Sequence, residues 1–194
     1  MTDDDAARTR LLDAAEALFY ARGVQAVGMD ELRAASGLPL KRVYRCFRGK
    51  HEIVAASLRR RDARWRAELA DHVTAHAATP QAAPLAVFDW LHTWFAAPGF
   101  RGCAFVNAVG ELGPAADDVA LAAREHKQAV HAYLAGLTRP LGVADHEALA
   151  AHLALLVDGA ITTAALTGDA AAAHRARAAA HTLLTAALNA RNGG

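Results

Sequence analysis

The sequence has little cysteine and no long apolar run, and both features limit what the protein can be. Its two cysteines, Cys46 and Cys103, lie far apart and in no metal-binding spacing. A disulfide framework is therefore not expected, and a reducing cytoplasm is the expected location. No eighteen consecutive residues are all apolar, which predicts that no helix spans a membrane. The acidic first ten residues lack an apolar core, so no secretory signal is expected.

Motifs of the common enzyme classes are missing as well. The sequence contains no G-x-S-x-G, no P-loop and no G-x-G-x-x-G. His72 and His76 would share one helix face with Glu68, but such a row on one helix is more typical of a solvated surface than of a metal site. His146 and His152 lie six residues apart, whereas the zinc-protease motif requires four. We therefore expect no catalytic residue, no metal, no cofactor and no enzymatic activity.

What the sequence does contain is a strong helical pattern. Apolar residues, many of them alanine, make up 54% of the 194 residues, and charged residues make up 21%, which is typical of a folded globular protein of one or two domains. Apolar spacing, glycines and prolines predict an all-α protein with about nine helices and no convincing strand. The expected helices span residues 6–22, 29–36, 39–47, 51–77, 85–97, 103–112, 115–137, 145–166 and 170–189.

Charge is distributed unevenly along the chain. The net charge is only +1. Residues 8–66 nevertheless hold fourteen Lys and Arg against six Asp and Glu, which leaves +8, and residues 67–194 hold seven against eleven, which leaves −4. A basic segment on a mildly acidic body is typical of a nucleic-acid-binding domain joined to a domain that does not bind DNA. Five arginines of the fourth helix are expected to form a solvated face: Arg59, Arg60, Arg61, Arg64 and Arg66.

Residues 23–47 carry the most informative pattern. An amphipathic helix over residues 29–36 ends at Gly37, and Pro39 can open the next helix because the first turn does not need its missing N–H. The second helix would place Val43 and Phe47 inward and its basic residues outward. Two short helices joined by a glycine-containing turn are typical of a helix-turn-helix, whose second helix enters the major groove of DNA.

The stretches GMDELRAASGL, KRVYRCF and RGKHEI resemble the DNA-binding domain of tetracycline-repressor (TetR) family regulators over roughly residues 8–58. The resemblance implies a homodimeric regulator with two domains. A helix-turn-helix domain (residues 1–50, with its connecting helix to about 58) would bind an operator. A helical domain (residues 51–194) would bind a small-molecule effector and dimerise through helices at about 145–166 and 170–189.

The candidate DNA-binding residues follow from the motif and from the resemblance. The resemblance implies that Tyr44 and Lys50 contact phosphates, although Tyr44 could instead be a half-buried spacer. Arg42 and Arg45 are candidates for base edges or phosphates, because a guanidinium can donate two hydrogen bonds to guanine. Gly28 replaces the capping Ser or Thr that the family commonly has. The full predicted set is Gly28, Met29, Pro39, Leu40, Lys41, Arg42, Tyr44, Arg45, Arg48 and Lys50.

Candidates for an effector pocket come from aromatic and polar residues on the later helices. Asp158 interrupts a strongly apolar helix, where a charge is costly unless it is paired or contacts a ligand. The alternative for every candidate is an ordinary role in the core. The predicted set is Trp90, Trp94, Phe95, Phe105, Asn107, Glu111, His131, His152 and Asp158.

The sequence thus predicts a DNA-binding transcriptional regulator, a repressor released from a near-palindromic operator by a small molecule. The alternative is a helical small-molecule-binding or enzymatic protein without specific DNA binding. Saturable binding to one DNA segment distinguishes the two.

Overall fold

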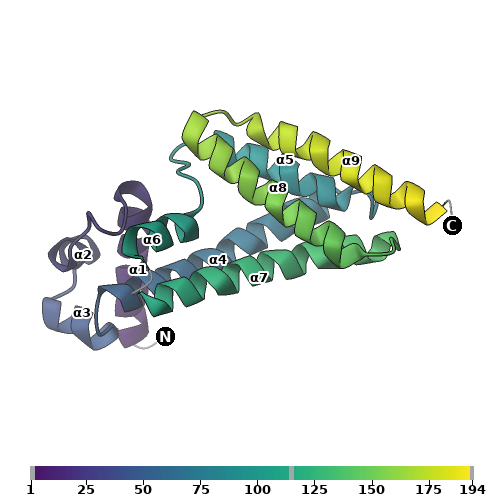
Figure 1. Ribbon diagram of the computed structural model, residues 1–194. Coiled ribbons are helices and arrows are strands. Elements are labelled where there is room, and N and C mark those ends of the chain that lie inside the picture. The colour runs from purple at the N-terminus through teal and green to yellow at the C-terminus, as the bar shows by residue number, and fades with distance from the viewer. Residues whose placement is uncertain (1–2, 114–115, 193–194) are drawn as a thin grey trace. The chain divides into compact units, whose positions relative to one another are not determined.

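The computed structural model describes residues 3–113 and 116–192 (Figure 1). Within these residues the chain forms nine α-helices and one short 3-10 helix, and no strand. The elements are α1 (Asp3–Arg22), α2 (Met29–Ser36), α3 (Leu40–Cys46), α4 (Lys50–His76), α5 (Ala83–Ala96), α6 (Ala104–Leu112), α7 (Asp117–Thr138), η1 (Arg139–Leu141), α8 (His146–Thr167) and α9 (Ala172–Asn192).

The predicted all-α class is confirmed, and the helix ends differ from the prediction by a few residues. The largest difference at a helix start is in α1, which begins at Asp3 rather than at residue 6. Its first turn consists of Asp3, Asp4 and Asp5, and acidic side chains there interact favourably with the positive end of the helix dipole. The predicted start of the seventh helix, at residue 115, lies outside the described residues.

The described chain divides into two compact units. The first unit runs to Arg64 and takes in the part from Cys103 to His126; the second comprises Trp65–Gly102 and the chain from Lys127 onward. Both α4 and α7 therefore contribute to each unit. The division into residues 1–50 and 51–194 stays a prediction.

In the first unit, α1 packs against α2 and α3. Its core joins α1 residues to the helix-turn-helix and to the start of α4, and α6 and α7 add further buried side chains. Fully or almost fully buried members from α1 to α4 are Leu11, Ala15, Leu32, Val43, Phe47 and Ile53. This core fixes the two short helices, which are too short to be stable in isolation.

The arginines of α4 form less of a solvated face than the sequence predicts. The Arg61 side chain is only 15% exposed and lies over the Tyr20 ring, 3.8 Å from its centroid. Arg61 and Arg64 both pair with Glu16 of α1, and Arg60 pairs with α1 as well. The prediction is wrong for Arg61 because spacing alone does not reveal an acidic helix alongside α4.

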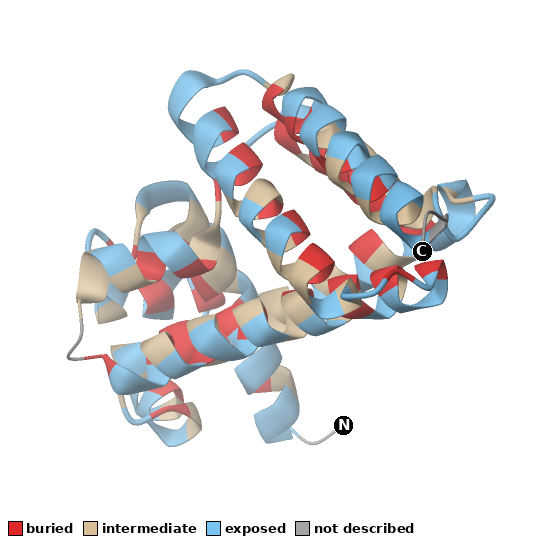
Figure 2. Ribbon diagram, turned by 45° about the vertical axis from the view of Figure 1, so that its right-hand side comes forward, coloured by how far each residue is buried: buried red, intermediate tan, exposed pale blue. Residues whose placement is uncertain are grey.

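In the second unit, α9 packs along α8 and α5. The buried residues of α8 follow one side of the helix and the exposed residues the other (Figure 2). By length and composition α8 could cross a membrane, with a mean hydropathy of 1.7 over its most apolar window, and 39% of that window is buried. The core helix of a soluble protein passes the same test of length and composition, so one such helix is weak support for a membrane span.

Candidate nucleic-acid interface

The turn between α2 and α3 has the geometry that the sequence predicts. Gly37 adopts the left-handed conformation, with φ 64°, and its N–H donates to the carbonyl of Ala34. Pro39 precedes α3, and its carbonyl accepts hydrogen bonds from the N–H groups of Arg42 (2.8 Å) and Val43 (3.1 Å). Glycine tolerates this φ and proline lacks only an N–H that the first turn leaves unused, so the residue types explain the sharp turn.

The outer face of α3 carries polar and apolar groups that a DNA groove could contact. Val43 is fully buried, whereas the Tyr44 side is open to solvent, with 51% of that residue exposed. Leu40 is 41% exposed, and Lys41 and Arg45 are also exposed. A helix that projects a lysine, an arginine and a tyrosine from one rigid face can contact phosphates and base edges together.

Two of the predicted contact residues are engaged by the start of α1. Arg42 Nη2 lies 2.5 Å from Asp3 Oδ2 and 3.0 Å from Asp4 Oδ1. Arg45 Nη2 lies 2.5 Å from the same Asp4 oxygen. The Arg42 side chain is 21% exposed. The sequence reasoning missed these aspartates, although three consecutive acids beside a basic segment were a visible signal.

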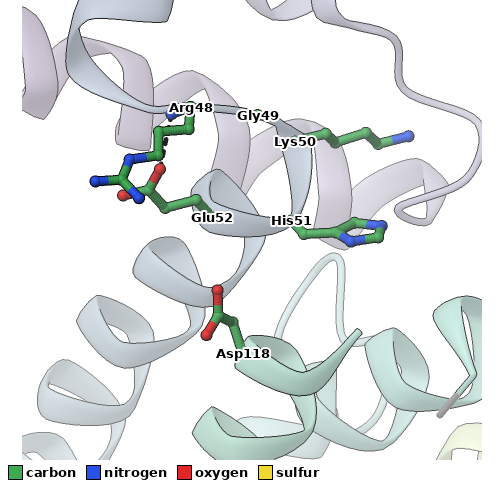
Figure 3. A pocket seen from close by; sticks show the side chains of 6 residues that line it. All are labelled: Arg48, Gly49, Lys50, His51, Glu52 and Asp118. Carbon is green, nitrogen blue, oxygen red and sulfur yellow. Dashed lines mark hydrogen bonds between the residues drawn. The ribbon is translucent and has the colours of Figure 1, made fainter. Parts of the chain in front are cut away.

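A second basic feature lies where α4 begins. Arg48, Gly49, Lys50 and His51 line an open hollow of about 520 Å³ with Glu52 and Asp118. The backbone N–H of Arg48 donates to Glu52 Oε2 at 2.7 Å. The Arg48 and Glu52 side chains lie together, while Lys50 and His51 extend away from them (Figure 3). The free N–H groups and dipole of a long helix favour an anion here, and Lys50 adds a positive charge.

Gly28 and Met29 occupy the start of α2. Gly28 is the N-cap, in an extended conformation, and has no side chain to accept a hydrogen bond. Its carbonyl accepts the N–H of Leu32 at 3.1 Å. Met29 packs partly buried against the core of the first unit. Their contact with DNA stays a prediction.

The residues predicted for the effector pocket are divided between the two units. Phe105, Asn107 and Glu111 belong to the first unit. Phe105 is buried and stacks on His126 with ring centroids 3.8 Å apart. Asn107 is exposed. Glu111 accepts a hydrogen bond from the backbone N–H of Gln25 at 2.8 Å.

The other six pocket candidates belong to the second unit. Trp90 and Trp94 stack with centroids 5.6 Å apart, and Trp94 also contacts Phe95 at 5.8 Å. Asp158 forms an ion pair with Lys127. His131 is half-buried and His152 is exposed. The structure thus brings three aromatic candidates together, and the pocket stays a prediction.

The described side chains include no cluster of three or more His, Cys, Asp or Glu that could hold a metal ion. The His72 and His76 rings stack with centroids 4.0 Å apart.

Known proteins with similar sequences and structures agree with this helix-turn-helix and all-α fold. Residues 11–57 match the sequence model of a family described as bacterial regulatory proteins, tetR family. The chain is similar to a TetR-family transcriptional regulator from Streptomyces coelicolor, with 30% identity and a TM-score of 0.85 over 95% of this chain and 97% of that one. It is also similar to a protein of Streptomyces avermitilis assigned to the same class of regulators, with 32% identity and a TM-score of 0.81 over 93% and 97%.

More distant structures share the fold. The reduced form of NemR from E. coli is 22% identical to this chain, with a TM-score of 0.80 over 91% of this chain and 95% of NemR. No curated protein matches the sequence.

Proposed function

This chain belongs to the TetR family of bacterial regulatory proteins, and on that premise we propose that it is a repressor released from a near-palindromic operator by a small-molecule effector. Family and fold make it a DNA-binding transcriptional regulator. The repressing role, the operator and the effector are the proposal. Its place of action is the cytoplasm, where the operator is.

The observation that carries the proposal is the outer face of α3. Val43 anchors this helix in the core, while Lys41, Tyr44 and Arg45 are exposed beside it. Phosphate contacts supply most of the affinity for DNA, and contacts with base edges supply sequence specificity. Lys50, at the start of α4, adds a cation at a helix N-terminus suited to a phosphate.

Homodimerisation through α8 and α9 is the second part of the proposal. Leu155 is 71% exposed and Leu166 is 82% exposed, both on α8. His152, Gly159 and Thr162 are exposed at helical spacing between or beside them. Two strongly exposed leucines on one face of a helix, with only small or polar residues between them on that face, are typical of a partner interface. A symmetric dimer would present two copies of α3 to two half-sites.

Effector binding in the second unit is supported by its aromatic side chains. Trp65 contacts Trp90 edge-on at 4.9 Å and Trp94 at 5.7 Å. Clustered aromatic rings are typical linings of sites for apolar or flat molecules. An effector that binds one conformation better than the other would shift DNA affinity by a coupling free energy of about 1–3 kcal/mol, typical of allosteric proteins.

The test is a titration of the protein onto the intergenic DNA beside its own gene, at several salt concentrations and with random duplex as competitor. We expect saturable binding to one segment and much weaker binding to random DNA. Uniform weak binding to both would contradict the proposal and favour a helical small-molecule-binding or enzymatic protein instead. A reporter gene behind that segment, with and without the protein, distinguishes repression from activation.

A further inference from the structure

The first turn of α1 forms ion pairs with the helix that is proposed to enter the DNA groove. Asp3 pairs with Arg42, and Asp4 pairs with both Arg42 and Arg45. The hydrogen bond from Arg42 and its positive charge lower the pKa of the Asp3 carboxyl. Asp3 is therefore ionised at neutral pH, when the guanidinium groups would also attract phosphates.

The contact is held in place by a neighbouring residue of α1. Arg8 Nη1 donates a 3.0 Å hydrogen bond to the carbonyl of Cys46, the last residue of α3. The Arg8 guanidinium also lies over the Phe47 ring, 4.0 Å from its centroid, and Phe47 is buried. The beginning of α1 is thereby fixed at the C-terminal end of α3, so Asp3 and Asp4 stay within reach of its arginines.

Helix stability alone explains part of this arrangement. Acidic residues in a first turn are favourable because of the helix dipole, which accounts for acids at these positions. It does not account for their pairing with two arginines of another helix. The arrangement also leaves Arg42 Nε buried without a hydrogen-bond acceptor in the described part of the chain. An unsatisfied buried donor is costly, and a phosphate could satisfy a guanidinium more fully because it offers several acceptor oxygens.

We propose that Asp3 and Asp4 are intramolecular competitors of DNA, which hold Arg42 and Arg45 until a DNA phosphate or base edge displaces them. This inference rests on the proposed DNA binding. In it, the two aspartates lower the affinity of the protein for DNA. The two carboxylates offset the positive charge of α3 in the free protein. Binding to random DNA is weakened most, because that binding depends almost entirely on phosphate contacts.

The test compares the wild-type protein with the Asp3→Asn/Asp4→Asn variant. Asparagine is close to aspartate in size and removes only the charge, and the small loss of favourable interaction with the helix dipole is read from a thermal melt. We expect affinity for random duplex to rise by up to about tenfold at low salt. A change of that size is the combined free energy of a few exposed ion pairs, expressed as a ratio of affinities. The slope of log K against log salt should steepen by about one to two, because each added phosphate contact contributes about 0.9.

Asp13→Asn is the matched control. Asp13 lies on the same helix and carries the same charge, but it pairs with Arg60 of α4. We expect little change in DNA affinity for this variant. A thermal melt verifies that each variant is folded, and Asp4→Asn alone replaces the double variant if that one does not fold. Asp4 contacts both arginines, so the single variant retains most of the expected effect.

A double-mutant cycle identifies the target of the aspartate. In an Arg45→Gln background, Asp4→Asn should increase affinity less than it does in the wild type. Unchanged affinity and salt slope in the Asp variants would overturn the inference, as would an equal effect in the Asp13→Asn control. Weaker binding would also overturn it, since the aspartates would then hold the arginines in place for DNA. If the wild-type protein binds no DNA, the proposed function itself fails.

Discussion

The carboxylate of Glu111, in α6, accepts a 2.8 Å hydrogen bond from the backbone N–H of Gln25, in the turn between α1 and α2. The Gln25 side-chain amide donates in turn to the Glu111 carbonyl. Gly23 adjoins the same carboxylate: a Cβ there would lie 2.9 Å from each of its oxygens. The last turn of α6 is thus hydrogen-bonded to the loop that leads into the helix-turn-helix.

Gly23→Ala should disrupt this contact. Gly23 has φ 86°, which is unfavourable for alanine, and the added methyl group would collide with the Glu111 carboxylate. We expect a loss of unfolding free energy of about 1–3 kcal/mol, measured by urea denaturation. The control is Gly37→Ala, which shares the left-handed φ, at 64°, but has no neighbour within 4 Å of the added group. Equal stability of the two variants would contradict the role assigned to the contact.

The helices themselves could be predicted from the sequence because their signals are local. Residues 29–36 were expected to be helical and α2 has those bounds, since apolar spacing and Gly37 mark its extent. The contact between Glu111 and Gln25 joins residues 86 positions apart. No periodicity relates such positions, so the sequence does not predict the hydrogen bonds between Glu111 and the turn, and the place of Glu111 in a pocket stays a prediction.

Lys50→Ala should weaken binding to operator and random DNA alike. Lys50 is the first residue of α4 and is expected to contact a phosphate, which contributes affinity without sequence specificity. The slope of log K against log salt should flatten by about one, measured by fluorescence anisotropy. Lys127→Ala is the matched control, because Lys127 pairs with Asp158 in the second unit. A loss confined to the operator would assign base contact to Lys50 instead.

The candidate site was less predictable than the fold. The composition of α3 is enough to predict an exposed basic face, and Tyr44 is exposed as the proposed contact with DNA requires. That Arg42 and Arg45 already have carboxylate partners was not foreseen, because a charge count over residues 8–66 leaves out Asp3 and Asp4. Ion pairs between helices depend on tertiary packing, and sequence spacing reports only on neighbours along one helix.

Leu166→Arg should dissociate the proposed dimer. Leu166 is 82% exposed on α8, so an arginine there disturbs no core packing within one chain. In a symmetric interface each substitution places a charge in both copies. We expect a shift from dimer to monomer in size-exclusion chromatography with light scattering, and weaker operator binding. Leu121→Arg, at a 41% exposed leucine of α7, is the control; dissociation by both variants, or by neither, would contradict the assignment to α8.

His72 should make the protein less stable in mild acid. Burial, and then the like charge of His76, lower the pKa of His72 below the ordinary value of 6.5, and its Nε2 is buried without a hydrogen-bond partner in the described chain. The folded protein therefore favours the neutral ring, whereas the unfolded chain takes up a proton as the pH falls through 6.5. Above pH 6.5 the neutral ring lowers no stability, because it is neutral in both states. As the pH falls below 6.5 toward the pKa of His72 in the folded protein, the unfolded chain gains a proton first and the free energy of unfolding decreases.

Melting temperatures at pH values of about 7.5 and about 5.5 measure this effect, because they lie on either side of the ordinary histidine pKa. His72→Gln removes the titrating group, so its melting temperature should fall less between the two pH values than that of the wild type. His181→Gln is the control, since His181 is an exposed histidine in the same unit. If His72→Gln and His181→Gln lose the same number of degrees on acidification, burial of His72 does not set the acid sensitivity of the second unit.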